Sequence, residues 1–381
     1  MKITIVQGAF LPMPPLRGGA VEKVWQGIGQ ELAARGHQVT HISRRFPGLP
    51  DAEKVDGIQH LRVGGHEAPG SLALLKLLDL NYSLKVRRIL PEADILVTNT
   101  FWLPILVRTR KHGALYVHVA RYPRGQFKYY RHAARLQTVS PFLAEAIRER
   151  VPECSARIKM ITNPLLDNIR LGKDEFDLVP RKPEFLFVGR VHPEKGIDNL
   201  LKAYTRYAEG NPSPWKLTVV GPWERHLGGG GDDYFAKVKA QVPDSLKDLV
   251  HWAGFTSEPS ELRRRLIEAG VFLYPTVAAK GEASPVAPLE AMGCGCPVLV
   301  SNLDCFQGLI EEGKTGFVFN HEVSDPSETL AARMKELSLN QTLRDEVARR
   351  GWEHAGTLSL SRITDEYEAD FKKVLLESSS S

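Results

Sequence analysis

Two glutamates in the last third of the chain stand eight positions apart. Glu282 lies in a loop-like stretch, and Glu290 is followed by Ala-Met-Gly-Cys-Gly-Cys-Pro-Val. We expect Glu290 near the start of a short helix that ends at these glycines and leads into a buried strand. Because ligands of α/β sheets bind at strand carboxyl ends and beside helix N-termini, such a carboxylate can accept both hydroxyls of a ribose. Glu282 can meet the hydroxyls of a sugar. Two solvated glutamates beside a loop are the alternative, and the Gly-rich apolar continuation argues against it.

Two cations follow another strand-like segment. The run from Phe187 to Gly189 ends a strand at a glycine, Arg190 comes next, and Lys195 stands five positions later, just before an expected helix. Two cations above a helix N-terminus can neutralise a diphosphate leaving group. This is the charge that a glycosyl transfer must stabilise while the C–O bond breaks. Ordinary surface charges would explain this pair equally well if it stood alone.

Two weaker features lie in the first half of the chain. Gly18 and Gly19 stand on the loop after the first strand, where backbone N–H groups could approach an anion or a sugar. Their spacing is not G-x-G-x-x-G, which disfavours a nicotinamide site. His118 ends another strand-like run. A lone histidine there is more often structural, although the carboxyl end of a strand favours a place in the cleft.

Strand-like and helical segments alternate through both halves, which indicates parallel sheets. The expected strands are 2–6, 38–43, 94–98, 114–119, 136–140, 184–188, 216–220, 271–274 and 297–300. The expected helices are 21–34, 197–208 and 260–269. We therefore predict an α/β protein of two Rossmann-like domains facing across a cleft, with a polar boundary at 165–182.

Bulk composition suits this architecture. The chain has 381 residues, 43% hydrophobic and 25% charged, which is typical of soluble two-domain proteins. It has no run of about 18 apolar residues, so we expect no membrane span. The first residues read as a strand and not as a secretory signal. The four cysteines form no CxxC pair or regular framework, so we expect a reducing, cytoplasmic setting.

The net charge of +5 is divided unevenly, with +12 in residues 1–170 and −7 in residues 171–381. This asymmetry predicts an anionic partner for the first half, such as a membrane surface or a phosphorylated acceptor. Five cations would share one stripe if their segment were helical: Arg121, Arg124, Lys128, Arg131 and Arg135. The leucine-rich stretch 72–90 also carries four cations: Lys76, Lys85, Arg87 and Arg88. It reads either as a helix on an anionic bilayer or as a helix packed on the sheet with solvated cations.

Taken together, these motifs resemble the retaining glycosyltransferases of family 4, which have the two-domain GT-B architecture. The resemblance runs through almost the whole chain. It includes Gly18-Gly19, His118, the pair Arg190 and Lys195, and Glu282 to Glu290 with its Ala-Met-x-x-Gly-x-Pro-Val continuation. It implies a retaining hexosyltransferase that uses a nucleotide-sugar, UDP-linked first and GDP-linked next, and that needs no metal or further cofactor.

Site roles follow from the resemblance and not from spacing. It implies that Arg190 and Lys195 bind the donor diphosphate, Glu290 the ribose and Glu282 the sugar hydroxyls. His118 would lie near the anomeric region of the transferred sugar, and Gly19 near the donor phosphate or the acceptor. Donor contacts are also expected at the turn made by Ser284, Pro285 and Val286. Many members of the family have Phe-Gly where this chain has Ser284-Pro285, and proline cannot donate a backbone N–H.

The resemblance also implies a domain division. We expect an acceptor-side domain over 1–168, a donor-binding domain over 169–355, and a C-terminal helix near 356–377 that returns to the first domain. The acceptor would be a glycan, a lipid-linked molecule or another anionic molecule, used in polysaccharide or glycoconjugate synthesis. The site would be cytoplasmic, at the inner face of the plasma membrane if the basic half binds lipid. Nucleic acid is not expected, because no binding motif accompanies the charge.

Two other functions stay open. An epimerase or phosphorylase of the same fold would turn over its donor without an acceptor. A catalytically inactive protein would bind a sugar nucleotide or an anionic membrane and turn over nothing. The presence of both cations and both glutamates favours transfer.

Overall fold

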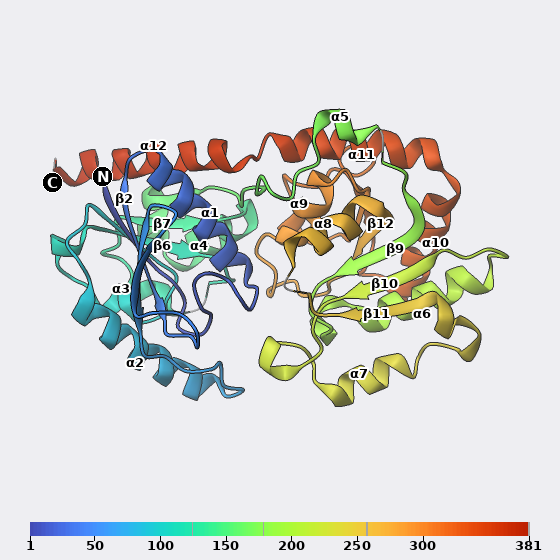
Figure 1. Ribbon diagram of the computed structural model, residues 1–381, viewed down its shortest axis with the longest axis horizontal. Coiled ribbons are helices and arrows are strands. Elements are labelled where there is room, and N and C mark those ends of the chain that lie inside the picture. Colours follow the sequence, from blue (N-terminus) through green and yellow to red (C-terminus); the bar gives the residue numbers. More distant parts are fainter. Residues whose placement is uncertain (124, 178, 257, 380–381) are drawn as a thin grey trace. The chain divides into compact units, whose positions relative to one another are not determined.

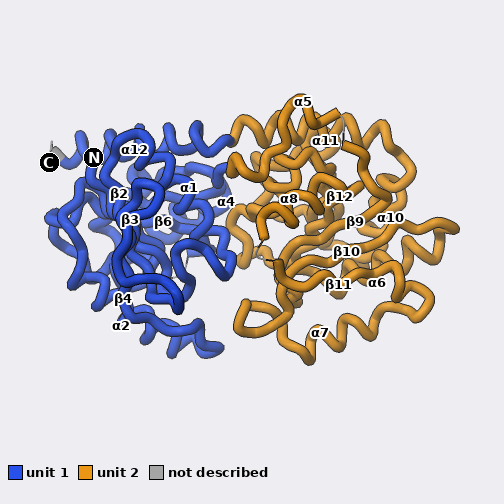
Figure 2. Tube along the Cα trace, viewed as in Figure 1, with its two compact units in different colours: residues 1–164, 359–381 blue, residues 165–358 orange. Residues whose placement is uncertain are grey.

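The computed structural model describes residues 1–123, 125–177, 179–256 and 258–379. The chain forms two compact units, one of residues 1–164 with 359–381 and one of residues 165–358 (Figure 2). The sequence-based boundaries lie at 168/169 and 355/356, and the structural ones lie at 164/165 and 358/359.

Unit 1 is built on an eight-stranded sheet in the order β3-β4-β2-β1-β5-β6-β7-β8. β3 pairs antiparallel with β4, and the other neighbours pair in parallel. The strands are β1 (Lys2–Val6), β2 (Gln38–Arg44), β3 (Ala52–Val55), β4 (Ile58–Val63), β5 (Ile95–Thr98), β6 (Ala114–Val119), β7 (Arg135–Thr138) and β8 (Ile158–Met160). β5 and β7 are buried at every position, and β1 is buried from Ile3 onward, because both faces of the sheet are covered. β1 and β5 are largely apolar, whereas β7 (Arg-Leu-Gln-Thr) buries polar side chains.

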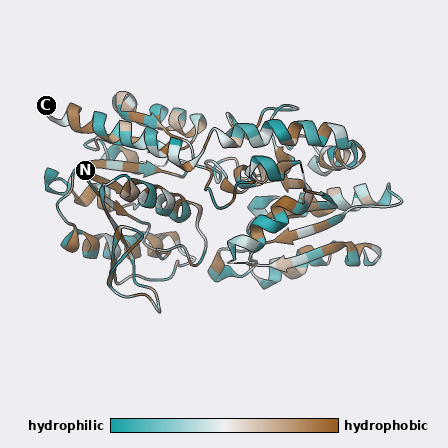
Figure 3. Ribbon diagram, turned by 45° about the horizontal axis from the view of Figure 1, so that its top comes forward, coloured by the Kyte–Doolittle hydropathy of each residue, from teal (hydrophilic) through white to brown (hydrophobic). Residues whose placement is uncertain are grey.

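Helices cover both faces of this sheet. α1 and α12 pack together on one face, and α2 lies on the other (Figure 1). The helices are α1 (Ala20–Ala34), α2 (Leu72–Ile89), α3 (Leu103–Leu106), α4 (Pro141–Arg150) and α12 (Leu360–Ser379). Short 3₁₀ turns lie at Arg110–His112, Gly125–Tyr129 and Pro152–Arg157. Hydropathy colouring shows largely hydrophobic strands and two-sided helices (Figure 3), which is the pattern of an α/β core.

The last helix, α12, is tied to unit 1 by a buried ion pair. Arg135 on β7 bonds the Asp370 carboxylate at 3.0 Å, and both side chains are 4% exposed. The Tyr116 hydroxyl donates to the same carboxylate at 2.8 Å. Near the start of the helix, Arg35 of α1 pairs with Asp365 at 2.6 Å. Because an unpaired buried charge is costly, these bonds hold the chain end on the first sheet.

The segment 121–135, whose five cations would share one stripe if it were helical, does not form that helix in its described residues. Among the residues of this segment that the structure describes, a short 3₁₀ turn covers Gly125–Tyr129, and strand β7 begins at Arg135. Pro123 and Gly125 disfavour a regular helix here. Arg135 is buried against Asp370 and is not available to an anionic surface. Arg124 lies outside the described residues.

Unit 2 contains a six-stranded parallel sheet in the order β11-β10-β9-β12-β13-β14. The strands are β9 (Lys182–Val188), β10 (Lys216–Val220), β11 (Val250–Gly254), β12 (Ala269–Tyr274), β13 (Val298–Ser301) and β14 (Phe317–Phe319). The helices are α5 (Lys173–Phe176), α6 (Ile197–Glu209), α7 (Asp232–Lys239), α8 (Pro259–Glu268), α9 (Val286–Gly293), α10 (Pro326–Leu339) and α11 (Gln341–Gly356). Short 3₁₀ turns lie at Pro193–Lys195, Arg225–Leu227, Asp244–Leu249 and Asp304–Phe306. One hydrophobic core joins this sheet to the inner sides of its helices.

Candidate functional site

The strand order of unit 2 reverses at β9. The chain continues from β9 to β10 and β11 on one side, and β12, β13 and β14 lie on the other. Ligands of open α/β sheets bind outside the carboxyl ends of the strands at such a reversal, because the connecting helices leave on opposite faces there. The residues that follow β9 and β12 are therefore the first candidates for a binding site.

Two of the predicted site residues meet at this reversal. Lys195, after β9, forms a buried ion pair with Glu282, after β12, and both side chains are 9% exposed. The Lys195 Nζ also donates to the Tyr274 hydroxyl at 3.1 Å, and that hydroxyl donates to Glu282 Oε1 at 3.1 Å. Burial and the Glu282 charge raise the pKa of Tyr274 well above its usual value, so it stays protonated. The Thr276 hydroxyl lies 3.2 Å from the same Oε1.

This arrangement leaves hydrogen-bonding capacity on both charged groups. Lys195, Tyr274 and Thr276 all contact Oε1 of Glu282. Within the described part of the chain, no hydrogen bond to Oε2 of Glu282 is found. An ammonium group has three donors, and Glu282 and Tyr274 take two of those of Lys195. The pair can therefore offer one acceptor and one cationic donor to a ligand while each charge stays compensated.

The turn that carries Lys195 is fixed against the end of β12. The Glu194 carbonyl accepts the Val277 N–H at 3.0 Å and lies 3.0 Å from the Thr276 hydroxyl. Gly196 has a left-handed backbone with φ 71°, and a methyl group there would collide with the Pro275 carbonyl. Only glycine suits this position, so the closeness of the turn to β12 depends on Gly196.

Arg190 lies beside this pair with a side chain that is 42% exposed. Its Nη1 donates to the Gly228 carbonyl at 2.8 Å, and its Nη2 pairs with Glu194. A guanidinium group has five N–H donors, so donors remain for an anion. Each predicted cation therefore has a carboxylate partner, and a diphosphate would bind to pairs that are already neutralised.

The remaining unit 2 candidates lie on and before α9. Glu290 is 5% exposed and occupies the fifth of eight helical positions, in the middle of the helix and not near its start. Pro285 is the N-cap, Val286 is the first helical residue, and Ser284 is half-buried before them. The first turn of a helix has N–H groups without intrahelical acceptors. Because Pro288 has no N–H, Val286 and Ala287 are the donors that this turn presents.

Unit 1 has a strand-order reversal of its own, between β1 and β5. A methyl group placed on Gly8, after β1, would lie 3.7 Å from Asn99 Oδ1 and 3.8 Å from Glu22 Oε1. Asn99 follows β5, and its Oδ1 is buried without a hydrogen-bond partner. Glu22, in the first turn of α1, is 6% exposed. The structure thus gathers an amide and a carboxylate around a small space above Gly8.

Glu22 was missed by the sequence analysis, and it changes the view of the paired glycines. Gly18 and Gly19 have φ of 75° and 98°, and a methyl group on Gly19 would collide with the Glu22 carboxylate. Burial raises the pKa of Glu22, while its own backbone N–H and the charge of Arg121 oppose that shift. The loop therefore has an acid beside it, which disfavours an anion at Gly19. A glutamate three positions after paired glycines was the signal available in the sequence.

His118 lies near the carboxyl end of β6 and is 4% exposed. Its Nδ1 hydrogen-bonds the Gln137 amide oxygen, and the Gln137 amide nitrogen donates to the Ile161 carbonyl at 3.0 Å. Gln137 is thereby oriented so that His118 Nδ1 carries the proton. Burial lowers the pKa of His118 to about 4, so the ring is neutral near pH 7. The Trp25 ring meets it edge-on at 5.4 Å.

This low pKa predicts acid destabilisation of unit 1. The unfolded chain binds a proton below about pH 6.5, whereas folded His118 resists protonation down to about pH 4. Stability is present above pH 6.5 and is lost as the pH falls, at up to about 1.4 kcal/mol per pH unit. Urea unfolding between pH 7 and pH 5 measures this slope. His118→Asn should have the shallower slope, and an equal slope in the variant would exclude His118 as the cause.

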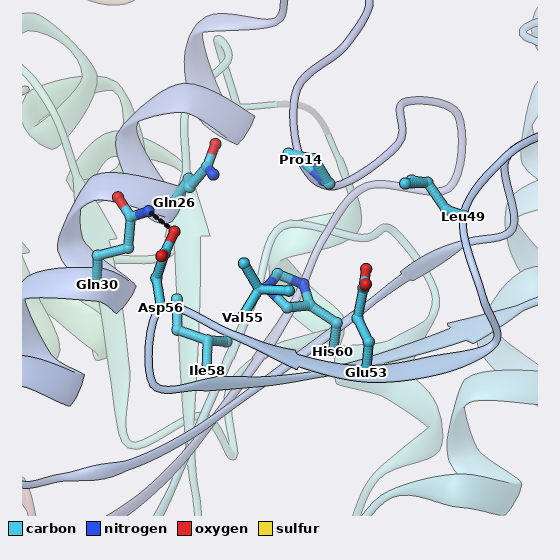
Figure 4. A pocket seen from close by; sticks show the side chains of 9 residues that line it. All are labelled: Pro14, Gln26, Gln30, Leu49, Glu53, Val55, Asp56, Ile58 and His60. Atoms are coloured by element: carbon cyan, nitrogen blue, oxygen red, sulfur yellow. Dashed lines mark hydrogen bonds between the residues drawn. The ribbon is translucent and has the colours of Figure 1, made fainter.

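A separate cavity of about 210 Å³ lies between α1 and the β3–β4 hairpin (Figure 4). Figure 4 shows Gln30 of α1 bonded to Asp56 of the hairpin at 2.8 Å, with His60 behind Val55. The nine side chains that line this cavity include none of the predicted site residues. In the described part of the chain, no three His, Cys, Asp or Glu side chains gather as a metal site.

Family comparisons match both halves of the chain. Residues 172–354 match the family described as Glycosyl transferases group 1, and residues 18–165 match Glycosyltransferase Family 4. The chain is a family 4 glycosyltransferase. Spore coat protein SA of Bacillus subtilis is 25% identical to this glycosyltransferase over 378 residues, which cover 92% of this chain and 93% of that protein.

Solved structures show that the glycosyltransferase has the GT-B fold. Sucrose-phosphate synthase from Thermosynechococcus elongatus aligns with a TM-score of 0.80 and 18% identity, over 99% of this chain and 100% of that one. HepE of Anabaena, solved in complex with UDP, aligns with a TM-score of 0.72 and 15% identity, over 98% and 100% of the two chains. At these identities the likeness concerns the fold.

Proposed function

We propose that this glycosyltransferase moves a hexose from a nucleoside-diphosphate sugar, UDP-linked first and GDP-linked next, to an acceptor hydroxyl with retention of anomeric configuration. The observation that carries the proposal is the buried Lys195–Glu282 pair at the strand-order reversal of unit 2. It sets a cationic donor and a carboxylate acceptor side by side, as a phosphate next to a sugar ring requires. Nucleotide-sugar epimerase and phosphorylase activities are the alternatives.

The donor roles follow from what each residue has left to offer. Lys195 and Arg190 bind the diphosphate with their remaining N–H groups, together with the N–H groups of Val286 and Ala287. Glu282 Oε2 accepts hydroxyls of the donor sugar. Glu290 accepts the ribose hydroxyls. HepE, whose structure contains UDP, supports UDP as the first donor to test.

The reaction then needs charge stabilisation more than a protein nucleophile. As the bond from the anomeric carbon to the diphosphate breaks, negative charge grows on the leaving oxygen, and Lys195 and Arg190 stabilise it. The acceptor hydroxyl attacks the same face, and the leaving phosphate takes its proton. Neutral His118 hydrogen-bonds near the transferred sugar and adds no charge of its own. No metal takes part in this proposal.

The acceptor hydroxyl is assigned to unit 1, at the space above Gly8. Glu22 accepts a hydrogen bond from the hydroxyl, and the Asn99 amide pairs with it. The acceptor itself is a glycan, a lipid-linked molecule or another anionic molecule, which the basic balance of residues 1–170 supports.

A thermal-shift panel of UDP-, GDP- and ADP-sugars tests the donor class. A ligand that binds only the folded protein raises the unfolding temperature when it is present well above its Kd. We expect one nucleotide series to stabilise the protein. No shift with any nucleotide diphosphate or sugar nucleotide would contradict the proposal. If the donor turns over equally fast with and without an acceptor, the result would favour an epimerase.

Gly8→Ala should weaken acceptor binding without disturbing the donor side. The added methyl group makes ordinary contacts with Asn99 and Glu22, so the fold tolerates it while the space is filled. We expect the acceptor KM to rise about tenfold, in line with the loss of a charged hydrogen bond. Nucleotide affinity should not change. Gly70→Ala is the matched control because no atom lies within 4 Å of the added methyl. An unchanged KM in Gly8→Ala would place the acceptor elsewhere.

A further inference from the structure

Helix α2 buries two polar residues and one aromatic residue, while five of its large apolar residues are exposed. Its buried residues are Asp79, Tyr82, Ser83 and Val86. Asp79 accepts the Trp102 N–H at 3.1 Å, and the Tyr82 hydroxyl lies 3.4 Å from the Ile42 carbonyl. These contacts fix which side of the helix faces the sheet. An amphipathic surface helix of a globular protein has the opposite arrangement, with its leucines facing the core.

The outward side is strongly apolar. Leu77 is 61% exposed and Leu84 is 41% exposed, and their spacing of seven places them on one stripe two turns apart. Three more α2 residues are large, apolar and exposed: Leu72 at 54%, Leu74 at 44% and Ile89 at 39%. Figure 1 shows α2 at the border of unit 1, with its outer side turned away from the sheet. Apolar residues grouped in this way mark an interaction surface.

Cations flank the leucine stripe. Lys76, Arg87 and Arg88 are exposed. Asp79 is the one acidic residue in the helix sequence, and it faces the sheet. The outer face of α2 therefore combines exposed leucines with positive charge. Long basic side chains beside leucines can extend toward lipid headgroups while the leucines enter the boundary of the acyl chains.

We infer that α2 docks this glycosyltransferase on an anionic phospholipid bilayer, through Leu77, Leu84 and the flanking arginines. The inference rests on the proposed function, for which it supplies a place: transfer at the cytoplasmic membrane surface to a lipid-linked acceptor. A second copy of the chain fits this face less well, because a symmetric contact would bring the same cations together. Among the described residues, no helix is both long and apolar enough to span a membrane, and docking by α2 requires none.

Co-sedimentation with vesicles tests the inference. The full-length protein is mixed with vesicles of phosphatidylglycerol and phosphatidylcholine, or of phosphatidylcholine alone. We expect binding to the anionic vesicles that falls as salt rises. The double variant Leu77→Gln/Leu84→Gln should bind at least tenfold more weakly, and Arg87→Gln/Arg88→Gln should lose most of the salt dependence. Glutamine has nearly the helix propensity of leucine, so α2 is retained.

The control is Leu339→Gln, which removes a 74% exposed leucine from α10 of unit 2 and should bind like the parent protein. Vesicle binding that persists unchanged in both α2 variants overturns the inference. Self-association that the Leu77→Gln/Leu84→Gln variant abolishes, without vesicle binding, also overturns it and assigns the face to a second copy. The nucleotide thermal-shift panel is run on the same samples. If no nucleotide raises the unfolding temperature, the proposed function is refuted. If a nucleotide raises it but both α2 variants still bind vesicles like the parent protein, only the docking role is refuted.

Discussion

Lys195→Met should reduce kcat about 100- to 1,000-fold. The variant keeps the length of the side chain and removes the cation that we propose stabilises the departing diphosphate. Removal of one preorganised donor from a charge-stabilising site costs roughly 2.7–4 kcal/mol of the activation barrier. Steady-state kinetics measure this fall in kcat, with the nucleotide-sugar that raises the unfolding temperature in the thermal-shift panel as donor and with its acceptor present.

The same variant should also destabilise the fold. Without Lys195, the Glu282 carboxylate is left buried and keeps only the Tyr274 and Thr276 hydroxyls as neighbours. Removal of one partner from a buried ion pair costs about 3–5 kcal/mol. The double variant Lys195→Met/Glu282→Gln removes both charges and should regain most of that stability. It should not regain activity, because both ligand contacts are gone.

This difference separates catalysis from folding. If kcat followed stability and recovered in the double variant, Lys195 would be a structural residue. Lys314→Met is the matched control, since Lys314 forms an exposed pair with Glu311. Such surface pairs contribute about 0–1 kcal/mol, so neither turnover nor stability should change much.

Glu290→Ala should weaken nucleotide binding about 100-fold. A carboxylate that accepts both ribose hydroxyls makes two charge-assisted hydrogen bonds, and each contributes about 1.5–3 kcal/mol. Titration calorimetry with the nucleoside diphosphate measures the change in Kd. Glu290→Gln, which keeps the shape and removes the charge, should have an intermediate affinity.

A nucleotide without the 2′-hydroxyl identifies the contact. It should bind the parent protein about tenfold more weakly than the ribonucleotide, because one charge-assisted bond is missing. The Glu290→Ala variant should bind the 2′-deoxynucleotide and the ribonucleotide with equal affinity, because it cannot make the hydrogen bond to the 2′-hydroxyl. A full 2′-hydroxyl preference in Glu290→Ala would mean that another residue binds the ribose.

Most of the fold could be predicted from local patterns of apolar and polar residues. The alternation of apolar strands and amphipathic helices predicted parallel sheets, and both sheets are parallel except at β3. The predicted helix 21–34 agrees with α1 to within one residue, since α1 begins at Ala20. Such agreement is expected because the signals that mark a helix are local in the sequence. The β3–β4 hairpin was not predicted, although its turn is Asp56-Gly57 between Val55 and Ile58. Its exposed edge strand has only one half-buried residue, so it lacks a hydrophobic pattern.

Local sequence sufficed to predict the fold class, the family resemblance and the residue types of the proposed donor site, since these depend on neighbours along the chain. Tertiary structure decided which groups meet. Lys195 and Glu282 lie 87 positions apart and pair because β9 and β12 are adjacent in the sheet. Arg135 would join a cationic stripe only if its segment were helical, but β7 places it inside, against Asp370. Glu22 joins Asn99 above Gly8 because β1 and β5 are neighbours. Strand order is set by burial across the whole domain, and no local stretch of sequence contains it.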